Sequence, residues 1–166
     1  DARVDQLPWV LPSETIAQTA KLTHWIVEDA KTARAFLKAV GTVSPLACTI
    51  QEMQMSEWRG VARNAKYGDA VKPMDLLKPL IAGKDMGLMS EAGVPGVADP
   101  GAELVLAAHK LGAKVKPLVG PSSILLGLMA SGLNGQRFAF QGYVPHDAQD
   151  RTARLKQLEV NLALTC

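Results

Sequence analysis

Apolar residues along this chain recur with two different periods. The short run 24–28 is rich in aromatic and β-branched side chains, which predicts a strand. The run 86–90 is apolar and bounded by turn residues, which is typical of a buried parallel strand. Residues 33–40 carry apolar side chains every three or four positions, which predicts a helix with Asp29 as its N-cap. Residues 101–111 form a second helical stripe. Strands that alternate with helices of about ten residues predict an α/β fold with a parallel sheet.

The remaining segments extend this alternation. Residues 57–72 are polar with little periodicity and predict a mobile loop. Further helices are expected at 14–22, 76–82, 122–131 and 151–159, with Ser13 as the N-cap of the first, and further strands at 114–119 and 138–142. The chain opens on polar residues and ends on apolar ones, so we expect it to be incomplete at both ends, with its first strand missing.

Composition narrows the class of protein. Hydrophobic residues make up 48% and charged residues 20%, which excludes a disordered chain. Apolar runs are far shorter than the roughly 20 residues that span a bilayer. The first residues lack a charged stretch followed by an apolar one, so we expect no secretory signal. A net charge of +2 gives no overall argument for nucleic-acid binding. The two cysteines and three histidines show no disulfide framework or metal-ligand spacing, so we expect no metal site.

The segment 90–101 (SEAGVPGVADPG) is the most informative stretch for function. It follows a predicted buried strand and precedes a helix, and in open α/β sheets ligands bind at this carboxyl end of the strands. Gly93 and Gly96 allow a ligand to approach the backbone closely. The N–H groups that begin the helix favour a carboxylate or a phosphate. The structural alternative makes Asp99 the N-cap and Pro100 the first helical residue, with the glycines only shaping the loop.

Two further segments can carry chemistry. The turn 120–123 (GPSS) also joins a predicted strand to a helix, and its hydroxyl and N–H groups can hold an adenosine or phosphate edge. A plain serine cap is the alternative. Glu28 and Asp29 end the first predicted strand, and paired carboxylates can act as a general base. A capped, solvated helix start is the simpler explanation of this pair.

Together these motifs resemble the tetrapyrrole methylase superfamily. The segments that carry the likeness are 90–101, 120–123, 131–133 (SGL) and 138–145 (FAFQGYVP). Within the superfamily the chain is most similar to the branch that 2′-O-methylates a cytidine of bacterial small-subunit ribosomal RNA, because 28–32 (EDAKT) resembles that branch's Glu-Asp-Thr-Arg stretch. Glu91 stands where the branch has Asp, and Ala30-Lys31 where it has Thr-Arg, so the chain resembles a divergent member.

The resemblance implies two α/β domains, residues 1–119 and 120–166, with S-adenosylmethionine as co-substrate in the cleft between them. It also implies a cytoplasmic homodimer. A ribose hydroxyl acceptor would profit from a base, for which Glu28 and Asp29 are the candidates. The residues expected to bind the methyl donor are Ser90, Glu91, Ala92, Gly93, Val94, Gly96, Asp99, Pro121, Ser122 and Ser123.

Three functions compete on the sequence alone. A methyltransferase acting on ribosomal RNA ribose is preferred, with a tetrapyrrole or corrin-type ring as the alternative acceptor. A basic rim would favour RNA, whereas a wide apolar cleft would favour the ring. A non-catalytic α/β module that binds an adenosine nucleotide would show binding without turnover. A domain whose glycine-rich loop is purely structural would bind no ligand.

Overall fold

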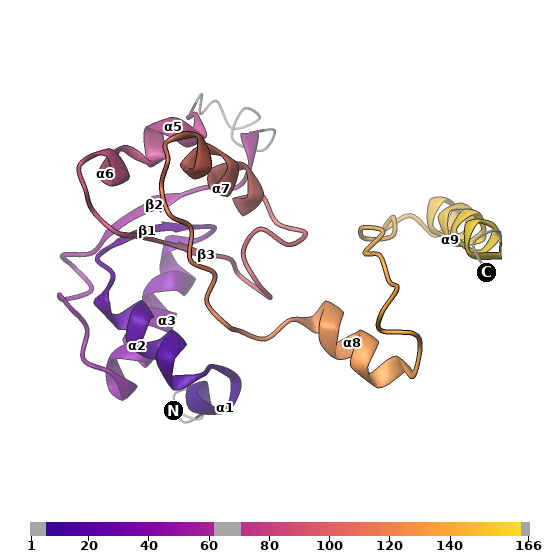
Figure 1. Cartoon of the computed structure of the whole chain (residues 1–166), viewed down its shortest axis with the longest axis horizontal. Coiled ribbons are helices and arrows are strands. Elements are labelled where there is room, and N and C mark those ends of the chain that lie inside the picture. Colours follow the sequence, from indigo (N-terminus) through magenta and orange to yellow (C-terminus); the bar gives the residue numbers. More distant parts are fainter. Residues whose placement is uncertain (1–5, 62–70, 164–166) are drawn as a thin grey trace. The chain divides into compact units, whose positions relative to one another are not determined.

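A computed structural model describes residues 6–61 and 71–163 of the chain. The chain divides into two units, Asp1–Ala130 and Ser131–Cys166, and the first holds a sheet with helices on both faces (Figure 1). The elements are α1 (Leu7–Val10), α2 (Ser13–Lys21), β1 (His24–Val27), α3 (Ala30–Val43), β2 (Gln54–Glu57), α5 (Pro73–Leu76), α6 (Lys78–Ile81), β3 (Met86–Met89), α7 (Gly101–Lys110), α8 (Ser123–Ser131) and α9 (Ala148–Ala163).

The three described strands form one parallel sheet in the order β2-β1-β3. His24 pairs with Gln54 on one side and with Met86 on the other, and Val27 pairs with the last residues of β2 and β3. All three strands therefore end level at the same edge. The parallel sheet predicted from the sequence is confirmed, because the central strand β1 is buried from Trp25 to Val27 as a doubly covered strand must be.

Alternate residues of β1 build two separate cores. Trp25 and Val27 pack against Leu37 and its neighbours on α3, so that helix covers one face. Ile26 points to the other face, where it packs with Trp58 and with residues of α7 such as Leu104. Side chains that alternate across a strand dictate this split. Figure 1 shows α2 and α3 on one side of the sheet and α5, α6 and α7 on the other.

Most predicted helices form close to their predicted bounds, with two corrections. Ser13 is not the N-cap of α2, because Pro12 occupies that position. The carbonyl of Pro12 accepts the first helical hydrogen bond, from Ile16 N (3.1 Å), and the ψ of Pro12 is 147°, which is not helical. The helix predicted at 76–82 is shorter in the structure: α6 covers Lys78–Ile81, and Leu76 is the last residue of a separate short helix, α5, with the break at Leu77. Pro79 explains the break, because proline lacks an N–H and its ring clashes with the carbonyl four residues earlier.

The strand predictions fail where a partner or a donor is missing. Residues 114–119 are irregular. Pro117 has no N–H to donate to a neighbouring strand, and the carbonyl of Val119 accepts a hydrogen bond from the Thr15 hydroxyl (2.7 Å) instead of from a strand. Residues 138–142 are also irregular, because the rest of the second unit that the structure describes is α9 and loops, with no strand to pair. The rings of Phe140 and Tyr143 meet edge-to-face there (5.7 Å).

The polar segment predicted as a mobile loop at 57–72 is partly wrong. Glu57 is the last residue of β2, a strand that the sequence pattern did not predict, and Trp58 directly after it is 2% exposed. Residues 62–70 lie outside the described part of the chain. The division of the chain at residue 120 stays a prediction. Within residues 6–61 and 71–163, no helix combines the length and apolar character needed to cross a membrane.

Candidate functional site

The site is built where the three parallel strands end. Val27 lies between Glu57 and Met89 in the sheet register, so the residues that follow each strand emerge at one edge. This is the edge at which open α/β sheets bind ligands. It gathers segments that lie about 30 residues apart in sequence: the Glu28-Asp29 pair, the residues after β2, and the loop from Ser90 to Pro100. The sequence analysis placed 28–29 and 90–101 each at the end of a predicted strand, and the register of the sheet brings the two segments to the same edge.

Glu28 faces the loop that follows β3. Its Oε1 accepts a hydrogen bond from the backbone N–H of Glu91 (3.3 Å). Partial burial and a hydrogen bond with the Asp99 carboxyl raise the pKa of Glu28 above its ordinary value of 4.5, while the bond from the Glu91 N–H works in the opposite direction. Glu28 is therefore a carboxyl with a higher proton affinity than an ordinary surface glutamate.

Asp29 is the N-cap of α3, as the sequence predicts. Its Oδ1 accepts from the N–H groups of Lys31 (2.9 Å) and Thr32 (2.9 Å). The bonds from Thr32 and Lys31 hold the pKa of Asp29 below its usual value, with a smaller contribution from the charge of Arg59. The cap commits this carboxylate to the helix, which leaves Glu28 as the stronger candidate for a base.

A single carboxylate organises the loop between β3 and α7. Asp99 Oδ1 accepts from Gly96 N (2.9 Å) and from Gly101 N (2.7 Å), so it binds both the loop and the first N–H of the helix. The predicted position of the cap is wrong by one residue: α7 begins at Gly101, and Pro100 rather than Asp99 holds the N-cap position. The fixed φ of proline places it at the helix entry, so Asp99 reaches the same N–H from one position further out.

The loop backbone is open where the glycines lie. Gly93 and Gly96 have φ values of 72° and 82°, a region that side-chain-bearing residues rarely adopt. A Cβ placed on Gly93 would meet no atom within 4 Å, so this stretch of backbone is accessible from outside. Ala98 also has a positive φ, 54°, which is uncommon for a residue with a side chain. The loop therefore has the open backbone that a closely bound ligand requires.

Two site residues lie immediately after β2. Arg59 Nε donates to the backbone carbonyl of Glu28 (3.0 Å), and its Nη2 lies 3.8 Å from Asp29 Oδ2 and 3.5 Å from Glu57 Oε2. Trp58 Nε1 donates to the carbonyl of Pro100 (3.1 Å) at the other side of the site. The sequence pattern did not predict β2 and so did not point to either residue. Their position directly after a strand is the signal that would have found them.

The second predicted segment is not brought to this edge by any described hydrogen bond. Ser122 lies at the start of α8, where its carbonyl accepts from Leu126 N (2.9 Å), consistent with a cap. The neighbouring Gly120 would place a Cβ 3.6 Å from Leu11, near α1 rather than near the strand ends. A donor-binding role for Pro121, Ser122 and Ser123 stays a prediction.

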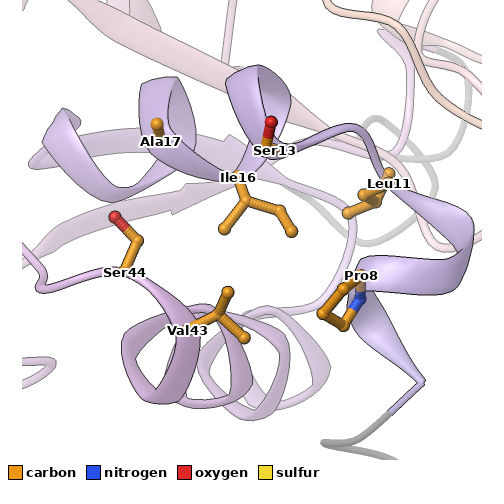
Figure 2. Close-up of a pocket in the computed structure, with 7 residues that line it drawn as sticks. All are labelled: Pro8, Leu11, Ser13, Ile16, Ala17, Val43 and Ser44. Atoms are coloured by element: carbon orange, nitrogen blue, oxygen red, sulfur yellow. The ribbon is translucent and has the colours of Figure 1, made fainter.

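The structure also has an apolar pocket away from the strand ends (Figure 2). Its volume is about 270 Å³, and it lies between α1, α2 and the last residues of α3. The residues that line it are Pro8, Leu11, Ser13, Ile16, Ala17, Val43 and Ser44. It is roughly 20 Å from the site along α3, at 1.5 Å per helical residue, and its lining carries no ionisable side chain. Among the described residues, no group of His, Cys, Asp and Glu could hold a metal ion.

Part of the chain is similar in sequence to proteins of known name. A 100-residue stretch is 34% identical to ribosomal RNA small subunit methyltransferase I of Vibrio cholerae, and an 83-residue stretch is 41% identical to the protein of that name from Xylella fastidiosa. The chain thus has rRNA methyltransferase relatives. A third, from Mesorhizobium japonicum, is 42% identical over 84 residues. These matches cover 60%, 50% and 51% of the chain, but only 34%, 30% and 29% of the respective relatives. No family model matches the chain.

Proposed function

We propose that this protein is an S-adenosylmethionine-dependent methyltransferase that modifies RNA of the small ribosomal subunit. The observation that carries the proposal is the 34–42% identity, over about half of the chain, to proteins named as methyltransferases of that RNA. The resemblance of the 90–101 motif to tetrapyrrole methylases supports the finer proposals. These are a ribose 2′-hydroxyl as acceptor, a cleft between two α/β domains, and a cytoplasmic homodimer.

In this proposal the loop after β3 binds the methyl donor. Ser90, Glu91, Ala92, Gly93 and Val94 line its first part, and Gly96 and Asp99 its second, with Pro121, Ser122 and Ser123 contributing from the start of the second domain. The open backbone at Gly93 fits a donor that approaches closely. S-adenosylmethionine supplies a methyl group already activated by a sulfonium, so the protein needs no nucleophile. Its residues bind, exclude water and align the acceptor, and alignment contributes roughly 7–11 kcal/mol.

The proposed base is Glu28 rather than Asp29. A ribose hydroxyl must lose its proton as its oxygen takes the methyl group, and a carboxylate at this edge can accept that proton. The raised pKa of Glu28 suits proton uptake, whereas Asp29 is committed to the cap of α3. Glu28→Gln is expected to lower kcat and leave donor affinity unchanged, because the glutamine oxygen can still accept from Glu91 N. Glu52→Gln, outside the site, is the control. Unchanged turnover in Glu28→Gln would remove Glu28 from the mechanism.

Donor binding is tested by thermal melting with S-adenosylhomocysteine, using NAD as the control ligand. At about 100 times its Kd a ligand adds roughly 2.7 kcal/mol of stability, which raises the Tm of a chain of this size by about 5–10 °C. Gly93→Val and Gly96→Val are expected to abolish the shift while the fold persists, because each places a branched side chain at a positive φ in the donor loop. No shift in the natural protein would leave the glycine-rich loop with a structural role only.

The acceptor is tested with a labelled methyl donor. Transfer to unmodified small ribosomal subunits, followed by mapping of the methyl group to a ribose oxygen, is the expected result. Transfer to a tetrapyrrole ring instead would replace the acceptor and keep the donor. Donor binding without transfer to either would leave a non-catalytic adenosine-nucleotide-binding module.

A further inference from the structure

A closed ring of contacts links the ends of all three strands. Arg59 Nε, after β2, donates to the carbonyl of Glu28 after β1 (3.0 Å), and the Glu28 carboxyl accepts from Glu91 N after β3 (3.3 Å). The Glu91 carboxyl accepts from the Thr32 hydroxyl in the first turn of α3. Thr32 N donates to Asp29 Oδ1 (2.9 Å), and Asp29 Oδ2 lies 3.8 Å from Arg59 Nη2, which closes the ring.

Arg59 is the single cation in this ring. Its neighbours contribute the carboxylates of Glu28, Asp29 and Glu91, and a further carboxylate of Glu57 lies 3.5 Å from its Nη2. Three of these acidic side chains come from separate strand ends, so like charges would push the segments apart without a cation between them. A guanidinium can contact a carbonyl through Nε and a carboxylate through Nη2 at the same time, which a lysine ammonium cannot do with the same spacing.

We propose that Arg59 is a positioning residue for the donor loop. It fixes the backbone at Glu28, Glu28 then holds the N–H of Glu91, and the first part of the loop, Ser90–Val94, is thereby held in the shape that receives the methyl donor. This inference rests on the proposed function only for its last step. The coupling of Arg59 to the loop is a property of the protein without any ligand.

The variants are Arg59→Ala and Arg59→Lys, with Arg34→Ala as the matched control. Arg34 is an exposed arginine on α3 whose guanidinium donates to the carbonyl of Ala30 in its own helix (3.4 Å) and to no other group among residues 6–61 and 71–163. Its removal makes the same change in net charge as removal of Arg59. The first measurement is amide hydrogen exchange in the protein without ligand. The N–H of Glu91 is expected to exchange about tenfold faster in Arg59→Ala than in the natural protein, as expected for loss of a hydrogen bond to a charged group.

The second measurement is the Kd of S-adenosylhomocysteine. It is expected to rise about tenfold in Arg59→Ala, to rise less in Arg59→Lys, and to stay unchanged in Arg34→Ala. If Arg59→Ala fails to fold, the Arg59→Lys protein decides on both measurements.

Four outcomes of these two measurements decide the proposal. Unchanged exchange of Glu91 in the Arg59 variants overturns the proposal, and so does full recovery in Arg59→Lys, because charge alone would then suffice. Faster exchange with an unchanged Kd also overturns it, since the loop shape would not matter for the donor. If the Glu91 N–H exchanges faster in the Arg59 variants but the natural protein does not bind S-adenosylhomocysteine, the proposed function is refuted. The coupling of Arg59 to the loop then still stands.

Discussion

Asp99 offers the sharpest test of how the candidate site is organised. Its Oδ1 accepts from Gly96 N (2.9 Å) and Gly101 N (2.7 Å), so a single oxygen ties the loop to the first turn of α7. Asp99→Ala removes both bonds, whereas Asp99→Asn keeps an oxygen in the same place and removes only the charge. The two variants therefore separate hydrogen bonding from electrostatics.

The structure sets the size of the effect. A hydrogen bond to a charged group contributes about 1.5–3 kcal/mol. Asp99 and Gly96 are half-buried and Gly101 is buried, and both bonds converge on one oxygen at a helix start. Loss of a side chain that caps a helix costs about 0.5–2 kcal/mol, so we assign about 2 kcal/mol to the two bonds together. In a chain of this length that lowers the Tm by about 4–8 °C. Asp99→Asn is expected to remain within about 2 °C of the natural protein, because asparagine accepts these bonds nearly as well. It also removes a negative charge beside Glu28, whose pKa Asp99 helps to raise.

The assay is thermal and urea unfolding at neutral pH, followed by circular dichroism, with S-adenosylhomocysteine affinity measured on the same samples. Equal destabilisation by Asp99→Ala and Asp99→Asn would refute the hydrogen-bond reasoning, since the charge would then carry the effect. A normal Tm together with a large loss of affinity in Asp99→Asn would show that Asp99 contacts the ligand directly.

Three further predictions concern the sheet and the ends of its strands. Gly87→Ala is expected to destabilise the protein by about 2–3 kcal/mol in urea unfolding, because the added Cβ would overlap the buried ring of Trp25; an unchanged midpoint would contradict this packing. Asp29→Ala is expected to lower the Tm by a few degrees and Asp29→Asn much less, because only the former loses the cap of α3; equal shifts would contradict the capping role. The raised pKa of Glu28 means that its contribution to stability is complete below its ordinary value of 4.5 and is lost as the pH rises through the raised value. The Glu28→Gln side chain stays neutral, so the unfolding free energy of this variant should decline less above pH 4.5 than that of the natural protein. Identical pH profiles for the two proteins would argue against a raised pKa of Glu28.

The elements that the sequence predicted well carry their signal locally. β1 and β3 are apolar runs bounded by turns, and the apolar stripe of α3 matches the residues that the structure buries, Ala33, Leu37 and Val40. Asp29 could be assigned as a cap because its partners are only two and three residues away. In such cases the physical cause of the structure lies within one turn or one strand.

The elements that were missed or wrongly predicted depend on distant partners. β2 reads as polar because its outer residues are exposed, and its extended shape comes from pairing with β1. Residues 138–142 have the composition of a strand but lack a neighbouring strand in the described part of their unit. Strand propensity describes fitness for a pleated, half-buried surface, and the sequence of one segment does not say whether that surface exists.

The same distinction explains which site residues the sequence could reveal. The loop 90–101 was found because glycines and an Asp-Pro pair mark an unusual backbone by themselves. Arg59 and Trp58 have ordinary side chains, and their importance arises only because a parallel sheet brings the ends of distant strands to one edge. Once two parallel strands of such a fold are predicted, a weak third strand is best sought by its place between them in the chain. A residue that follows it, such as Arg59, reaches the candidate site as directly as one that follows a strong strand, because position at the edge, and not the strength of the strand, decides which side chains lie there.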